Sequence, residues 1–342
     1  MPRAPECWIG VLVPAADGGP LRPPEARPLG RAALALAGEG IGVVFGEQIE
    51  GGRMTGLVAV RGGWQHRARV PLVALHDRFP SQTFPERFAA GVAGAGGLPV
   101  GNPPALTALC RDKLACQAWL EGQGLVLPPV EAEAARFASV LEAWGAGFLK
   151  PRYGGLGRGV RRVNPGDALP AEGEGAVPGL MEPLFLQRAV QPPAGWAGWS
   201  LRVLVQRTEE GGWTIPARVL RRSREDPVVN VARGADVGLA DAALPVGALV
   251  DLDRLALVTA AAIARAPGCE PAVEVGVDAV LGADGGLHLI EVNGRPQGRL
   301  EVLAAQDPER WEPVHLEACA RPLRVLAALP RWSGRRDADA TT

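Results

Sequence analysis

The chain has 342 residues, of which 47% are hydrophobic and 21% are charged, and its formal net charge is −1. This length predicts about two domains, and the near-neutral balance gives no support to nucleic-acid binding, which would need a clustered excess of Lys and Arg. No apolar run approaches about 18 residues, so we predict no membrane span.

The cysteines and the first residues are typical of a cytoplasmic protein. Residues 1–10 lack the basic region and apolar core of a secretory signal. The five cysteines are scattered outside any CxxC or Cys/His cluster, which favours reduced thiols over disulfides or a zinc site.

The first third of the chain predicts a small α/β domain. Two apolar segments predict buried strands with a helix between them, at residues 8–13, 29–37 and 41–46. A hairpin is expected about residues 61–63, and a further short strand ends at His76-Asp77-Arg78. The Pro- and Gly-rich stretch 91–104 predicts a domain boundary.

The rest of the chain predicts helices and two more hairpins. Asp112 is expected to cap a helix that ends near Glu121. Apolar residues spaced i, i+3, i+4 and i+7 predict an amphipathic helix over 137–144. Alternating segments about 211–212 and about Asp284-Gly285 predict the two hairpins.

A glycine-rich segment follows a predicted strand at Lys150. Its four glycines allow successive backbone N–H groups to point the same way, which forms a nest for phosphate oxygens; they are Gly154, Gly155, Gly157 and Gly159. No GK[ST] follows, which excludes a P-loop. A surface hairpin is the alternative, but Lys150 is one of two lysines among 36 basic residues, and Tyr153 is the one tyrosine. These rare residues favour a binding loop.

The last hairpin carries two acidic residues. If Asp284-Gly285 is a two-residue turn, Asp278 lies directly opposite Glu291 and Asn293 shares their face, while Ile290 points to the apolar side. Opposed like charges destabilise a strand pair, and a cation between them reverses that cost. Oxygen ligands of this kind suit Mg²⁺. A slipped register or a solvated face is the alternative.

Together these segments resemble the ATP-grasp superfamily. The resemblance rests on Asp112-Lys113, on KPRYGGLGRG from residue 150, and on GVDAVLGADGGLHLIEVN, which ends at Asn293. It extends to the YheC/YheD-like (endospore coat-associated) family through LHDRFP, LQRAV, SLRVLVQRTEEGGWTIPARVLRR, NVARGAD and IEVNGRP. The similar region covers residues 8–328.

The resemblance implies an α/β (α+β) chain with an ATP-grasp fold and a small N-terminal α/β domain of the pre-ATP-grasp kind. The implied parts are the N-terminal domain 1–104, a lid subdomain 105–183 with the Gly-rich loop, and a C-terminal subdomain 184–330 with the metal site. The polar composition of residues 331–342 predicts a mobile tail.

The resemblance also implies residue roles. Lys113 and Lys150 would hold nucleotide phosphates under the loop of Tyr153, Gly154, Gly155, Gly157 and Gly159. The hinge that meets the adenine would be Gln187, Arg188, Ala189 and Val190, with Glu182 beside it. Arg202 and Arg218 would steady the γ-phosphate and an acyl-phosphate intermediate, with Asn230 near the metals. Asp278, Glu291 and Asn293 match the metal ligands, and Arg295 would meet a substrate carboxylate.

The implied function is an ATP-dependent carboxylate–amine or carboxylate–thiol ligase that uses ATP with Mg²⁺ or Mn²⁺ and releases ADP and phosphate. Its partners would be small-molecule or peptide carboxylates and amines, with neither nucleic acid nor membrane. A non-catalytic, nucleotide-binding spore-coat protein is the alternative, with spore association in place of a cytoplasmic location. Two departures from the family pattern are Ser200 in place of an aspartate and Gly234-Ala235 in place of a glycine pair.

Overall fold

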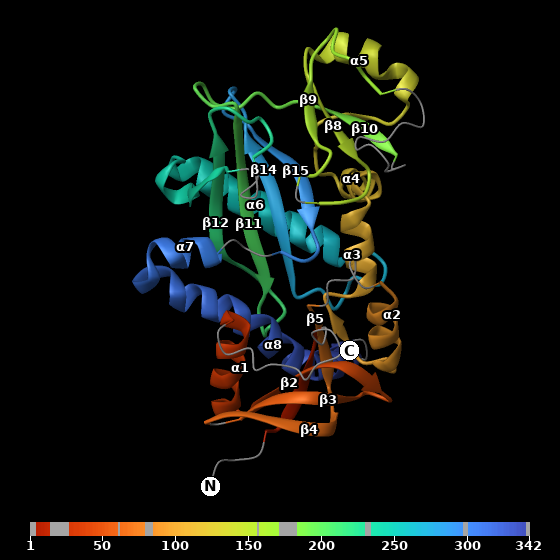
Figure 1. Ribbon diagram of the computed structural model, residues 1–342, viewed down its shortest axis with the longest axis vertical. Coiled ribbons are helices and arrows are strands. Elements are labelled where there is room, and N and C mark those ends of the chain that lie inside the picture. The colour runs from red at the N-terminus through yellow and green to blue at the C-terminus, as the bar shows by residue number, and fades with distance from the viewer. Residues whose placement is uncertain are drawn as a thin grey trace.

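Three β-sheets follow one another along the long axis of the molecule, with the N-terminal sheet at the bottom of Figure 1 and the lid at its top. The computed structural model describes residues 5–13, 27–60, 62–78, 85–155, 157–170, 183–229, 234–296 and 300–339. Glu182 and Asn230 lie outside these described residues.

The N-terminal sheet has the strand order β4-β3-β2-β1-β5-β6, in which β2, β1, β5 and β6 are parallel. Its elements are β1 (Cys7–Leu12), α1 (Pro28–Gly38), β2 (Ile41–Glu50), β3 (Arg53–Val60), β4 (Gly63–Pro71), β5 (Ala74–Asp77), α2 (Pro85–Gly94) and β6 (Val100–Gly101). The predicted strands, helix and hairpin of this domain are confirmed. Asp77, at the carboxyl end of β5, pairs with Arg295 just beyond β15 of the central sheet.

The lid is a four-stranded antiparallel sheet in the order β7-β10-β8-β9. The segment holds α3 (Pro104–Arg111), α4 (Lys113–Gly122), β7 (Val130–Glu131), a 3-10 turn (Ala134–Arg136), α5 (Phe137–Trp144), β8 (Gly147–Pro151), β9 (Arg161–Val163) and β10 (Leu184–Arg188). Asp112 caps α4, as predicted, by accepting a hydrogen bond from the Ala115 amide at 3.1 Å. Because β10 belongs to this sheet, the lid ends after residue 188 and not at the expected 183.

The central sheet is antiparallel in the order β13-β12-β11-β14-β15. Its elements are β11 (Gly198–Arg207), β12 (Trp213–Ser223), β13 (Asp236–Leu239), a 3-10 turn (Ala240–Ala242), α6 (Val246–Ala264), β14 (Glu274–Leu281) and β15 (Leu287–Asn293). Helix α6 covers one face, where its Leu252 and Ala256 pack with Val203 and Val277 in a fully buried core. On the opposite face, Leu204 and Val219 pack with Leu300 and Leu303 in a second apolar cluster. A polar cluster of Arg202, Arg221 and Asp278 lies on the same face.

The end of the chain returns to the first domain. After α7 (Leu300–Gln306), α8 (Pro308–Asp339) packs Leu323 and Leu326 into the core of the N-terminal sheet with Ile9 and Val11. Helix α8 runs to Asp339, so residues 331–339, which the sequence assigned to a tail, continue a helix. Within the described residues, no helix combines the length and apolar content needed to cross a bilayer.

Asn102, just after β6, joins the N-terminal and central sheets. Its side chain is buried, and it donates to the carbonyls of Glu274 and Gly294 at 2.6 Å each. Its oxygen accepts from the amides of Val273 and Glu274 at 2.8 and 3.2 Å. One amide thus satisfies four backbone groups at the ends of β14 and β15, which fixes these strands relative to the first domain.

Candidate active site

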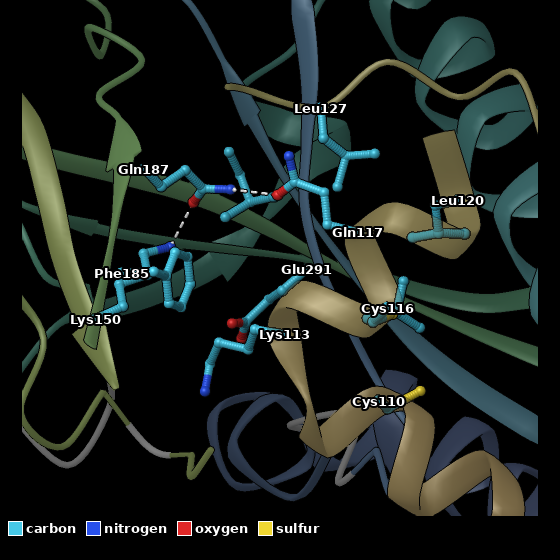
Figure 2. A pocket seen from close by; sticks show the side chains of 12 residues that line it. Cys110, Lys113, Cys116, Gln117, Leu120, Leu127, Lys150, Phe185, Gln187 and Glu291 are labelled. Carbon is cyan, nitrogen blue, oxygen red and sulfur yellow. Dashed lines mark hydrogen bonds between the residues drawn. The ribbon is translucent and has the colours of Figure 1, made fainter. Parts of the chain in front are cut away.

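A cavity lies where α4 and the lid strands β8 and β10 meet β15 of the central sheet. Its lining includes Lys113 and Gln117 from α4, Lys150 from β8, Gln187 from β10 and Glu291 from β15 (Figure 2). The two predicted phosphate lysines and one predicted metal ligand therefore face the same space, although 178 residues separate the first from the last in sequence.

The two lysines differ in their surroundings. Lys150 is 8% exposed, and its ammonium donates to Gln187 Oε1 at 2.7 Å. Burial lowers the pKa of Lys150, and the nearby charge of Glu291 opposes that shift. Lys113 donates to the carbonyls of Pro151 and Gly154 at 3.3 and 3.0 Å. Two ammonium groups at one cavity favour a polyanionic ligand.

The glycine-rich loop needs glycine for its backbone conformation. Gly154, Gly157 and Gly159 have φ values of 110°, 68° and 67°, a region that other residues rarely adopt. The loop turns tightly, because the amides of Arg158 and Val160 each donate to a carbonyl three residues earlier at 3.3 Å. Gly155 has no such φ, and Leu156 lies outside the described residues. That this loop cradles phosphate stays a prediction.

Strand register brings the predicted metal ligands together. Asp278 on β14 lies opposite Glu291 on β15, as predicted, and Asn293 donates to Asp278 Oδ2 at 3.2 Å. Among the described residues, no three or more His, Cys, Asp and Glu side chains gather as a metal site. The candidate set has two carboxylates and one amide, all hard oxygen donors, which fits Mg²⁺ better than a softer metal.

The turn of this hairpin differs from the prediction. The Gly282 amide donates to the Gly286 carbonyl at 2.8 Å, so the loop has three residues and not two. A bulge between Asp278 and Ala279 then restores the predicted opposition. Because of the bulge, Leu289 enters the core and Ile290 lines the cavity, which corrects the expected orientation of Ile290.

Two arginines hold Asp278, which is 5% exposed. Arg202 on β11 pairs with both carboxylate oxygens, with Nη2 at 2.6 Å from Oδ2, and Arg221 on β12 donates to Oδ1 at 3.0 Å. Burial alone would raise the pKa of Asp278, but the two guanidinium groups outweigh it and hold that pKa below its usual range. The carboxylate is therefore ionised, and both arginines stay beside the metal-ligand set.

Arg218 does not join them, which corrects a prediction. In the β11–β12 register it lies opposite Val203, whose side chain faces α6. Its guanidinium pairs with Asp253 of α6 and with Asp241 at 3.2 Å. Because strand side chains alternate, Arg221, three residues later, lies on the other face and takes the position expected for Arg218.

The predicted adenine hinge is only partly directed at the cavity. The amides of Arg188 and Ala189 already donate to the carbonyls of Pro129 and Ala146, at 2.9 and 3.0 Å, and Arg188 is exposed. Gln187, in contrast, points its side chain into the cavity. Both N–H groups therefore support the lid sheet. That the backbone of residues 187–190 meets the adenine stays a prediction.

Arg295 lies at the junction of the N-terminal and central sheets. Its guanidinium pairs with Asp77 at the end of β5, and next to it Arg78 pairs with Glu274 at 3.1 Å. Burial lowers the pKa of Arg295, although Asp77 opposes this. A contact between Arg295 and a substrate carboxylate stays a prediction.

His76 is buried at the same junction, between two hydrogen-bond partners. Its ring is 1% exposed, donates from Nδ1 to the Gly101 carbonyl at 2.8 Å and accepts at Nε2 from Arg78 at 3.1 Å. Burial, helped by Arg78, lowers the pKa of His76 from 6.5 to about 3. Below pH 6.5 the His76 imidazole is therefore protonated in the unfolded chain, whereas in the folded chain it stays neutral down to about pH 3.

We expect the free energy of unfolding to fall by about 2 kcal/mol between pH 6.5 and pH 5 through this residue, at about 1.4 kcal/mol per pH unit. Urea unfolding at both pH values measures it. His76→Gln should flatten the difference, and His66→Gln, at an exposed position of β4, should leave it unchanged. An equal pH dependence in all three proteins contradicts the prediction.

Comparisons with known proteins agree with this arrangement. Residues 199–315 match the family described as YheC/D like ATP-grasp. The structure aligns with D-cycloserine synthetase DcsG at 17% identity and a TM-score of 0.58, over 92% of this chain and 99% of that one. It also aligns with the VanG D-Ala:D-Ser ligase from Enterococcus faecalis at 14% identity and a TM-score of 0.57, over 96% of this chain and 99% of that one.

A third solved structure, the ATP-grasp ligase PsnB complexed with a precursor peptide and AMPPNP, aligns at 14% identity and a TM-score of 0.55, over 94% of this chain and 99% of that one. The protein has the ATP-grasp fold. The resemblance and the fold predicted from the sequence are thus confirmed. No curated protein matches the sequence significantly.

Two residues of the site escaped the sequence analysis, Arg221 beside Asp278 and Gln117 in the cavity lining. Arg221 stands in an arginine run whose side chains alternate between two faces, and its period-two spacing from Val219 was the available signal. Gln117 lies one helical turn after Lys113, so the spacing i, i+4 on a predicted helix could have placed both on one face.

Proposed function

We propose that this protein is an ATP-dependent ligase that joins a carboxylate to an amine or a thiol. In the first step the γ-phosphoryl group moves from ATP to a carboxylate oxygen, which forms an acyl phosphate and ADP. The amine or thiol then attacks the acyl carbon, loses its proton, and displaces phosphate.

The observation that carries this proposal is one cavity lined by two lysines and by Glu291, whose partner across the strand pair is Asp278. Phosphoryl transfer asks a protein mainly for positioning and charge neutralisation. Lys113 and Lys150 would bind the nucleotide phosphates, and Arg202 and Arg221 would stabilise charge on the transferred group. The glycine-rich loop, tied to Lys113, would exclude the water that hydrolyses an acyl phosphate.

Asp278, Glu291 and Asn293 would hold Mg²⁺ or Mn²⁺, because their oxygen atoms share one face of the β14–β15 pair. When bound, such an ion neutralises charge on the nucleotide phosphates. Solved neighbours of this fold are described as ligases for D-Ala and D-Ser and as a synthetase of D-cycloserine, which supports a carboxylate substrate.

Release of ADP tests the proposal. We expect Mg²⁺-dependent ADP release when the protein meets pooled amino acids and short peptides. Glu291→Gln keeps the size of the side chain and removes its charge, so turnover should fall at least about 100-fold. The control is Glu270→Gln, the same change at an exposed position, which should keep full turnover.

Mass spectrometry of the pools would identify the ligated product. Binding of ATP without turnover on any pool would contradict the ligase and favour a nucleotide-binding protein of the spore coat or another structural role.

A further inference from the structure

Two buried amides form a chain of hydrogen bonds from Gln117 on α4, through Gln187 on β10, to Lys150 on β8. Gln117 is 5% exposed, and its Nε2 donates to Glu121 Oε1 at 2.8 Å and to the Pro128 carbonyl at 3.1 Å. Its Oε1 accepts from Gln187 Nε2 at 3.4 Å, and Gln187 Oε1 accepts from Lys150 at 2.7 Å (Figure 2).

The direction of this chain is set at its far end. An amide nitrogen has two hydrogens and no acceptor capacity, and two oxygen acceptors use both hydrogens of Gln117. A reversed Gln117 would place its oxygen against two other oxygens. Its Oε1 must therefore face Gln187, which in turn must present its own oxygen, and not its NH₂ group, to Lys150.

The consequence for Lys150 is electrostatic. Its ammonium is desolvated, and an NH₂ group turned toward it would add a second donor where the charge needs an acceptor. We infer that Gln117 is a positioning residue that orients Gln187 and thereby aims the Lys150 ammonium at the nucleotide phosphates. This rests on the proposed function, because it requires that the cavity bind a nucleotide.

The test compares ADP with adenosine by calorimetry in the presence of Mg²⁺. Adenosine lacks the phosphates that Lys150 would contact. A wrongly oriented Lys150 ammonium should therefore weaken the binding of ADP and leave the binding of adenosine unchanged. Gln117→Met keeps the volume and removes the amide. We expect it to weaken ADP binding about fivefold to tenfold and adenosine binding less than about twofold. The same change at Gln123, beyond the end of α4, is the control and should alter neither.

A double-mutant cycle separates orientation from packing. Gln187→Glu presents an oxygen to Lys150 whichever way the carboxylate turns, so Gln117 has nothing left to orient. In that background Gln117→Met should change the ratio of ADP to adenosine affinity less than about twofold.

The inference is overturned if Gln117→Met lowers the ratio of ADP to adenosine affinity equally in the wild type and in Gln187→Glu. It is also overturned if Gln117→Met alone weakens the binding of ADP and of adenosine by the same factor. That second comparison decides the matter even if the Gln187→Glu variants do not fold. A wild-type protein that binds neither ligand overturns the proposed function itself, and the inference with it.

Discussion

Lys150→Met is expected to weaken ATP binding at least about 100-fold, a loss of about 2.7 kcal/mol. The ammonium is buried in the cavity and shares it with Lys113 and Glu291, so phosphate oxygens would gain a charged hydrogen bond there without much competition from water. Calorimetry with a non-hydrolysed ATP analogue measures the affinity.

The same substitution should not lower the free energy of unfolding of the nucleotide-free protein. Burial lowers the pKa of Lys150, which means that the folded state disfavours its charge. We therefore expect Lys150→Met to unfold at the same urea concentration as the wild type or at a higher one.

Two further variants sharpen this prediction. Lys150→Arg should also bind ATP poorly, because a broad guanidinium does not fit where a compact ammonium donates to Gln187. Arg161→Met, at an exposed position of the neighbouring strand β9, is the control and should bind as the wild type does. ATP affinity within about threefold of wild type in Lys150→Met would show that this residue is not a phosphate ligand.

Asn102→Ala is expected to lower the free energy of unfolding by about 3–5 kcal/mol. The substitution removes four hydrogen bonds and leaves buried backbone groups of Val273, Glu274 and Gly294 without their partner. Each such group costs about 1–3 kcal/mol, less where water enters the gap. Urea unfolding followed by tryptophan fluorescence measures the loss.

Asn102→Asp should cost at least as much as Asn102→Ala, because its second oxygen would replace the NH₂ group against the buried carbonyl oxygens of Glu274 and Gly294. Asn164→Ala, in an exposed turn closed by Asp167, is the matched control and should cost under about 1 kcal/mol. A similarly small loss for Asn102→Ala would mean that the two sheets are held together elsewhere.

Local patterns predicted the parts of this protein that depend on nearby residues. Alternation about a Gly-containing turn placed Asp278 opposite Glu291, and Asp112 identified the start of α4. Two departures cancelled in the first case: the loop is one residue longer than the Asp-Gly pair suggested, and a bulge compensates for it. Hydrophobic burial of Val277 and Val292 on one face explains why the compensated register wins, since a slip would expose them.

Contacts between side chains on separate elements could not be predicted from the sequence. Arg218 and Arg221 stand in one strand, and which of them faces Asp278 depends on the register of β12 against β11. The same limit applies to Gln117 and Gln187, which are 70 residues apart, and to the four bonds by which Asn102 joins two sheets.

By itself, then, the sequence determined the hairpins, the capped helix and which residue types supply charge, because strand alternation, helix capping and glycine-rich turns act over a few residues. The ATP-grasp fold was implied by the resemblance of its ordered motifs to that superfamily. The tertiary structure alone decided which arginine stands at the acidic pair and which amides orient Lys150. Those choices depend on how separate elements pack, where one residue of register exchanges the two faces of a strand.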